Sequence, residues 1–210
     1  MSSAKTKRVA LAAGLLLLSH FAHAAEPEES PSPLRLFGRA AYSAGGAKIA
    51  SGTYVNTGNN YDVTTGGGAT FAIGAEMQLS DAVSVQVTTG RQTQNIDATN
   101  GDLKLSRNPQ EAIVFYQFHP KWKVGAGVRQ DKNLDFSWRH DTAGSGSRKL
   151  DAGTGKVIDV QYLFSPREKK SARSLQAGLS LHLIQQNYTD SLTQTRYGAN
   201  QVGIGVFFYY

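Results

Sequence analysis

The sequence predicts an all-β protein, an eight-stranded antiparallel up-and-down transmembrane β-barrel. Three observations predict it. After residue 33, apolar and polar residues alternate with period two, which indicates strands with two different faces. Eight such segments occur, and the links between them are alternately short and long, as in membrane barrels. No run of about 18 apolar residues occurs in this region, so a membrane-spanning helix is not expected there.

The first 24 residues have the features of an export signal. Lys5, Lys7 and Arg8 precede a short apolar run over 9–18, and an Ala-His-Ala sequence ends at Ala24. Small residues at these spacings suit signal peptidase, so we expect cleavage near Ala24. An uncleaved anchor is less favoured, because the apolar run is shorter than the roughly 20 residues that a spanning helix needs.

Composition excludes several classes of function. The predicted signal holds three of the 22 basic residues and none of the 16 acidic ones, so its removal lowers the net formal charge from +6 to +3. With no Lys/Arg-rich helix and no base-stacking motif, nucleic-acid binding is not expected. The absence of cysteine excludes a disulfide scaffold and a thiolate metal site. No spacing indicates a zinc or calcium site, and we expect no cofactor.

The chain after the signal divides into a leader and a barrel. Residues 25–33 are acidic and proline-rich, which predicts a flexible leader, and the barrel is expected over 34–210. The predicted strands are 34–42, 69–79, 83–92, 111–118, 122–129, 156–164, 175–188 and 201–210. The short links are 80–82, 119–121 and 165–173. The longer links, expected to be external loops, are 43–68, 93–110, 131–155 and 189–196.

Alternation alone leaves the apolar face pointing either inward, as in a soluble lipocalin-type barrel, or outward to lipid. The other face is rich in Gly, Gln, Ser and Thr, which suits the narrow lumen of eight strands. The chain also ends on an apolar strand, whose edge we expect to close onto the first strand. Aromatic residues at the short-turn ends predict a membrane-interface girdle: Phe118, Trp122, Phe164, Phe208 and Tyr210, with Tyr42, Tyr162 and Tyr188 as weaker candidates.

The predicted lumen contains charges of both signs. In this register they are Arg35, Arg39, Glu76, Glu111, Lys123, Arg129, Asp159 and His182. Isolated buried ions are very costly, so these groups are expected to pair. The favoured interpretation is a hydrogen-bonded plug that fixes the barrel, and the alternative is a narrow or gated channel.

With these features, the chain from Leu34 to Tyr210 resembles the small Gram-negative outer-membrane barrels, of the OmpX, OmpW and opacity types and the membrane domain of OmpA. The aromatic last strand resembles the signal read by the outer-membrane assembly machinery, although it ends in Tyr210 where the family more often ends in Phe. The resemblance implies the outer membrane as location, and as partners its lipid and lipopolysaccharide, the assembly machinery and periplasmic chaperones. It assigns no subfamily or oligomeric state.

The expected function is a non-enzymatic scaffold with external loops, contributing to envelope integrity or to surface interaction and adhesion. The first alternative is a narrow pore for small or apolar solutes. A lipid A-modifying enzyme comes third, because Ser180 and His182 share a face and His140, Asp141 and Ser145 fall in one predicted loop. The serine and histidine are expected to face the lumen, away from lipid, so no catalytic residue is assigned.

Overall fold

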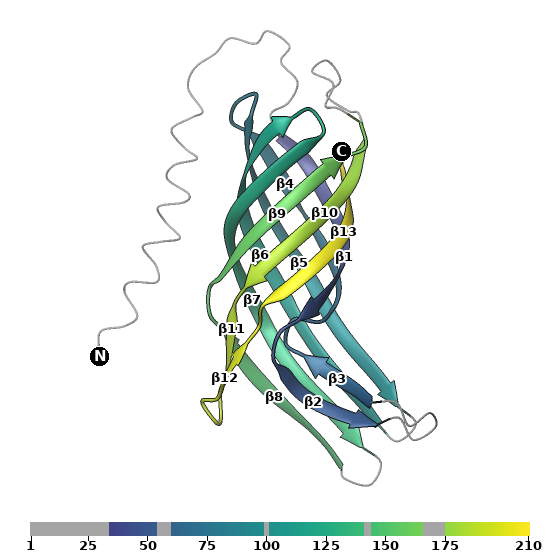
Figure 1. The fold of residues 1–210 in the computed structure, drawn as a ribbon. Helices are drawn as coiled ribbons and strands as arrows, with labels where there is room; N and C mark the ends of the chain where they lie inside the picture. The colour runs from purple at the N-terminus through teal and green to yellow at the C-terminus, as the bar shows by residue number, and fades with distance from the viewer. Residues whose placement is uncertain (1–33, 54–59, 99–100, 141–143, 166–174) are drawn as a thin grey trace, which may run out of the picture. The chain divides into compact units, whose positions relative to one another are not determined.

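The computed structural model describes residues 34–53, 60–98, 101–140, 144–165 and 175–210. Every element within these ranges is a strand (Figure 1). None of the described residues belongs to a helix long and apolar enough to cross a membrane. The predicted export signal and leader, 1–33, and residues 166–173 of the third short link lie outside the described residues.

Eight strands form the barrel wall: β1 (Leu34–Gly45), β4 (Gly68–Gln78), β5 (Val83–Ala98), β6 (Gly101–His119), β7 (Trp122–His140), β9 (Gly155–Leu163), β10 (Gln176–Gln185) and β13 (Gln201–Tyr209). Each pairs antiparallel with its neighbours in that order. β1 also pairs with β13, from Phe37 opposite Tyr209 to Gly45 opposite Gln201, which closes the sheet. The eight-stranded antiparallel barrel is therefore confirmed.

Three of the four predicted external loops, 43–68, 93–110 and 131–155, are largely strands, which corrects the sequence interpretation, whereas 189–196 is mostly a turn between β11 and β12. β5, β6 and β7 run well past the predicted ends, and β8 (Gly144–Ala152), β11 (Asn187–Asp190) and β12 (Arg196–Gly198) join them in one sheet. β2 (Lys48–Thr53) and β3 (Asn60–Thr64) form a separate hairpin. We call this region, in the lower part of Figure 1, the outer extension: β2, β3, β8, β11, β12 and the adjoining ends of β5, β6 and β7.

The predicted continuous strand 175–188 is also wrong at its far end. β10 pairs with β9 and stops at Gln185, whereas β11 begins at Asn187 and pairs with β8. A corresponding change of partner occurs on β7, which pairs with β9 as far as Arg129 and with β8 from Leu134 onward. Where the barrel meets the outer extension, β8 therefore enters the sheet between β7 and β11.

The two faces of the wall have opposite chemistry. Each wall strand exposes an apolar side chain on the outside: Leu36, Ile73, Val87, Val114, Val124, Ile158, Leu181 and Ile204. Along β13 and the residue that follows it, the exposed apolar residues run from Val202 to Tyr210. At roughly 3.3 Å per residue and a tilt of about 40°, they cover about 20 Å along the axis, close to the apolar band of membrane barrels. The predicted outward apolar face is therefore what the structure shows.

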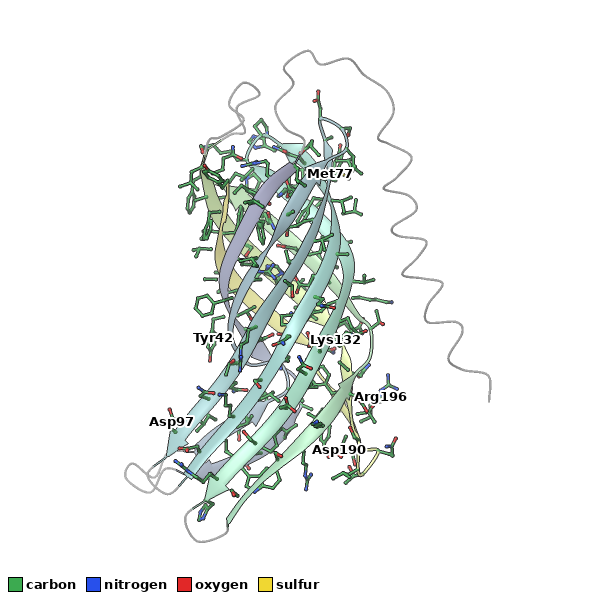
Figure 2. The ribbon with its side chains drawn as sticks, turned by 180° about the vertical axis from the view of Figure 1, so that it is seen from behind. Tyr42, Met77, Asp97, Lys132, Asp190 and Arg196 are labelled. Atoms are coloured by element: carbon green, nitrogen blue, oxygen red, sulfur yellow. The ribbon has the colours of Figure 1, made fainter. Side chains whose placement is uncertain are left out.

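Figure 2 shows how the ends of this apolar band are arranged. Met77 lies near the short turns, Tyr42 and Lys132 lie at a common level farther along, and Asp97 and Asp190 lie beyond them in the outer extension. The short turns at 79–82 and 120–121 are as compact as predicted.

Aromatic side chains fill the lumen near the short turns. Phe37, Phe207 and Tyr209 pack together with Leu163, with ring centroids 5.3 to 6.0 Å apart. Glycines make room for such rings: a Cβ added to Gly125 would lie 2.6 Å from the Phe115 ring. The small residues predicted for the lumen thus accommodate large neighbours and do not leave empty space.

Candidate functional site

The inside of the barrel holds a continuous polar network, whose first layer lies near the short turns. The Lys123 ammonium donates to Glu76 and lies 2.5 Å from the Tyr209 hydroxyl. The Tyr209 oxygen is also 2.7 Å from Glu76 Oε2 and 2.9 Å from Gln161 Oε1. Gln86 Nε2 donates to the same hydroxyl at 3.0 Å. Residues from five strands thus meet at one buried tyrosine.

The second layer is centred on Glu111. Arg39 Nη2 donates to Glu111 Oε2 at 2.8 Å, and Arg129 Nη1 donates to Oε1 at 3.0 Å. Arg39 Nη1 also lies 2.6 Å from His182 Nε2 and 3.7 Å from Asp159 Oδ2. All five side chains are buried. One carboxylate therefore holds two guanidinium groups across the lumen.

The third layer joins the barrel to the outer extension through Asp131. Arg129 Nε donates to Asp131 Oδ1 at 2.8 Å, and the Tyr188 hydroxyl of β11 donates to Oδ2. Arg107 lies 3.7 Å from the same carboxylate, and it shares Gln92 Oε1 with Arg129, at 3.0 and 2.7 Å. Burial raises the pKa of Tyr188, so its hydroxyl stays protonated as the donor.

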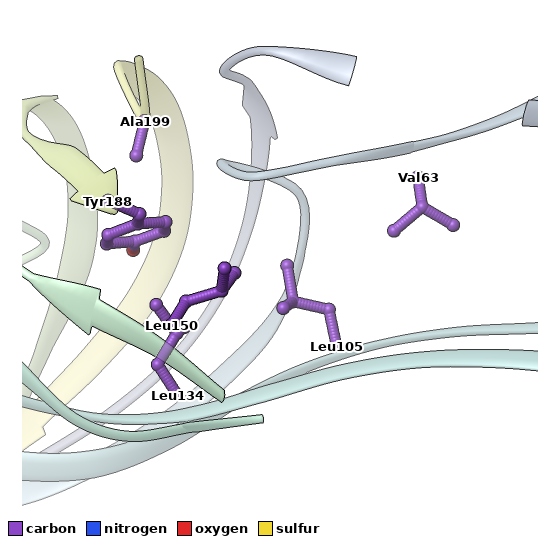
Figure 3. Close-up of a cluster of buried hydrophobic side chains, with 6 residues drawn as sticks. All are labelled: Val63, Leu105, Leu134, Leu150, Tyr188 and Ala199. Atoms are coloured by element: carbon purple, nitrogen blue, oxygen red, sulfur yellow. The ribbon is translucent and has the colours of Figure 1, made fainter. Parts of the chain in front are cut away.

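Beyond this layer, toward the outer extension, the polar network gives way to a packed apolar cluster, which we call the outer cluster (Figure 3). It comes from β3, β6, β7, β8, β11 and the link before β13, and its buried members are Val63, Leu105, Leu134, Leu150, Tyr188 and Ala199. The hairpin of β2 and β3 contributes Ile49 and Ala50 as well. Apolar packing thus covers the outer end of the polar network.

Seven of the eight charged residues predicted for the lumen are buried there: Arg39, Glu76, Glu111, Lys123, Arg129, Asp159 and His182. Arg35 is half-buried, with its guanidinium 4.4 Å from the Tyr209 ring centroid. Among the described residues of the three layers, four buried bases (Arg39, Arg107, Lys123 and Arg129) face four buried acids (Glu76, Glu111, Asp131 and Asp159). This balance of charge is what a buried network requires.

Sequence reasoning missed several members of the network. Arg107 and Asp131 were assigned to loops, and Tyr209 and Gln92 were not recognised as lumen partners. A strand pattern around Arg107 was present, because Leu103, Leu105 and Arg107 alternate with exposed or half-exposed neighbours. Polar residues around them favoured a loop, although strands outside a membrane need no lipid-facing apolar side chains.

The predicted girdle residues Phe118, Trp122, Phe164, Phe208 and Tyr210 all lie exposed on the outside of the barrel at the short-turn end. Trp122 packs against Tyr162, with ring centroids 4.8 Å apart. Tyr42 is exposed at the opposite edge of the apolar band. Tyr188 was wrongly considered for this role: it is fully buried and bonded to Asp131, because β11 leaves the membrane wall.

The residues considered for catalysis do not form a lipid-facing site. Ser180 and His182 are both buried on the lumen side of β10, and the histidine is bonded to Arg39. Ser145 pairs across the sheet with Arg139, whereas His140 pairs with Gly144. Asp141, the third member of that set, lies outside the described residues.

Comparison with known proteins gives structural similarity only. No protein-family model matches, and no curated protein matches. The attachment invasion locus protein Ail of Yersinia pestis is 9% identical, over 84% of this chain and 97% of its own, with a TM-score of 0.49. Neisserial surface protein A (NspA) is 15% identical, over 84% and 96%, with a TM-score of 0.48. The outer membrane protein OprG of Pseudomonas aeruginosa is 7% identical, over 88% and 99%, with a TM-score of 0.39.

These similarities are too weak to carry a functional argument. The assignment of the fold depends on the pairing of the eight wall strands and on the apolar outer face.

Proposed function

We propose that the protein is a non-enzymatic outer-membrane barrel, whose closed lumen serves as a rigid base for the outer extension at the cell surface. Its role would be in envelope integrity or surface interaction. The observation that carries this proposal is the unbroken plug, from the Tyr209 layer through Glu111 and Asp131 to the outer cluster. Loops and extensions on such a scaffold are where binding residues usually lie.

The surface chemistry supports the proposed location. An apolar band this wide on the outside of a closed, polar-lined barrel is unfavourable in water, whereas the acyl chains of a bilayer can cover it. Exposed bases border the band at its outer edge: Arg91 on β5, Lys132 on β7 and Lys156 on β9. These cations suit the phosphates of lipopolysaccharide, which we propose as the lipid partner on this side.

Cysteine labelling tests the location and the orientation together. The chain has no cysteine, so a single introduced thiol is a clean reporter. Asp97 is exposed in the outer extension, and Asp81 is exposed in the short turn between β4 and β5, so Asp97→Cys and Asp81→Cys place one thiol at each end of the barrel. In intact Gram-negative cells, a membrane-impermeant maleimide should label the first variant and not the second. After permeabilisation both should react. Labelling of Asp81→Cys alone in intact cells would reverse the orientation and contradict the proposal.

Planar-bilayer recording tests the closed lumen. The wild-type protein should insert, as shown by its heat-dependent gel mobility, and give no reproducible unitary conductance. A reconstituted porin would show that the bilayer reports open channels. Regular conductance steps from the wild-type barrel would contradict the plug and favour the narrow pore. A change in the mass spectrum of lipid A between cells with and without the protein would instead indicate an enzyme.

A further inference from the structure

The outer extension contains an open groove that the plug does not use. It has a volume of about 390 Å³ and lies between β2 on one side and β6, β7 and β8 on the other. Its apolar lining is continuous with the outer cluster, since Ile49, Ala50, Leu103 and Phe136 belong to both. The packing of these residues in the outer cluster therefore holds the two walls of the groove apart.

Trp138 forms the floor of this groove in a fixed orientation. It pairs across the sheet with Gly146, and a Cβ added to Gly146 would lie 2.3 Å from Trp138 Cζ2. The indole therefore lies flat across the backbone of β8. The Phe136 ring lies 5.7 Å away at an angle of 31°, and the Arg148 guanidinium lies 5.8 Å from the indole. Two neighbouring aromatic faces are thus positioned before any ligand arrives.

Polar groups stand at the edges of these rings. Asp102 and Arg139 pair one residue along from Leu103 and Trp138, so their ion-paired side chains lie on the other face of the sheet, away from the indole. His140 lines the groove and shares the face of Trp138. Arg148, whose side chain is about half exposed, lies 3.5 Å from Asp190. A guanidinium and an imidazole therefore lie beside the aromatic floor of an open groove. An acyl chain gains little in such a site, because it needs an enclosed, dry cavity.

A sugar ring has the complementary surface. One face of the sugar consists of C–H groups, which pack on an aromatic ring, and its edge consists of hydroxyls, which form hydrogen bonds with guanidinium and imidazole groups. We propose that the groove binds sugar rings of a glycan, with Trp138 as the stacking platform and Arg148 and His140 as edge contacts. A carboxylate on the glycan gains a further charge-assisted bond to Arg148. This inference depends on the proposed function for the exposure of the groove at the cell surface.

Tryptophan fluorescence provides the test, because the chain has two tryptophans and only Trp138 lies in the groove. In a Trp122→Phe background, the emission of the refolded full chain in detergent reports this single indole. Titration with a neutral oligosaccharide, with a sialylated trisaccharide and with the delipidated core oligosaccharide of lipopolysaccharide distinguishes the sources of the sugar. We expect a saturable change in emission with at least one of them.

Two variants determine where the binding occurs. Gly146→Val keeps Trp138 but displaces its ring, so it should weaken the apparent affinity at least tenfold. Ser137→Ala is the matched control, on the same strand and outside the groove lining, and should leave the affinity unchanged. Retained β content by circular dichroism would show that both variants fold.

Three outcomes would overturn the proposal: no saturable response to any of the sugars, an equal affinity in Gly146→Val, or saturation by decanoate or an extended peptide in place of sugars. The binding assay uses purified protein, whereas the labelling of Asp97→Cys uses cells. Failure of the glycan site can therefore be distinguished from failure of the proposed surface location.

Discussion

Glu111→Gln is the sharpest test of the charged plug. The substitution keeps the shape of the side chain but removes its charge and replaces one acceptor oxygen with a donor. Glu111 accepts from Arg39 at 2.8 Å and from Arg129 at 3.0 Å. Hydrogen bonds to charged groups contribute about 1.5–3 kcal/mol each. One of the two would be lost outright, and the other would be weakened.

The two cations limit the size of the effect, because each has another partner. Arg129 keeps Asp131 at 2.8 Å, and Arg39 keeps Asp159 at 3.7 Å. The removal of one partner from a buried ion pair costs about 3–5 kcal/mol. We therefore expect Glu111→Gln to lower the free energy of unfolding by about 3 kcal/mol, the lower end of that range.

Urea unfolding of the protein in lipid vesicles measures this difference, with tryptophan fluorescence and heat-dependent gel mobility as two readouts. The control is Gln110→Ala, the exposed neighbour on β6, which should change stability by less than about 0.5 kcal/mol. Arg39→Gln combined with Glu111→Gln removes one cation together with the acid and should recover part of the loss. A Glu111→Gln protein within about 1 kcal/mol of wild type, with an unchanged urea dependence, would refute the reasoning.

Three further predictions test other parts of the structure. Leu179→Arg, on the lipid face, should lower membrane stability by about 2–4 kcal/mol, whereas Leu192→Arg in the exposed outer turn should change it little; equal effects on urea midpoints would contradict the face assignment. Tyr188→Phe should cost about 1–3 kcal/mol in the same assay, because it leaves a buried carboxylate short of a donor. Backbone amides of Thr193 and Leu192 hold the pKa of Asp190 below its ordinary value, so its stabilisation is complete above that ordinary value and is lost as the pH falls through the lowered pKa. The protection of the amides in this turn, expressed relative to their intrinsic exchange rate at each pH, should therefore be high at pH 7 and lower at strongly acidic pH, and Asp190→Asn should remove that dependence.

The barrel wall could be predicted from sequence because lipid imposes a strict pattern. Each outward position must be apolar over the membrane thickness, so the period of two is visible without an alignment. Leu179, Leu181 and Leu183 show it directly, and all three are exposed on β10. Outside the membrane this constraint ends, and β8 and the ends of β5 and β6 carry polar outward residues such as Lys104 and Ser147. They were therefore taken for loops.

The sequence predicted which charged residues face the lumen, but not which of them contact one another. Alternation placed Arg39, Glu111 and Arg129 inside, yet the sequence does not specify which strands lie opposite one another across the barrel. Arg39 is 72 residues from Glu111, and the contact depends on the stagger of the closed sheet. Tyr209 illustrates the same limit, since its parity placed it on the inner face, whereas its contacts with Lys123 and Glu76 could not be predicted from the sequence.

Asp131 links the barrel to the outer extension mechanically. It lies on β7 between Arg129, the last residue paired with β9, and Leu134, the first paired with β8. The backbone adapts at Asn133, whose φ of 49° is left-handed, a conformation that asparagine tolerates better than most residues. At this break in the wall, Asp131 accepts bonds from Arg129 inside the barrel and from Tyr188 in β11. One buried acid thus replaces the strand pairing that is interrupted there, and it holds the outer extension in a fixed relation to the membrane-spanning wall.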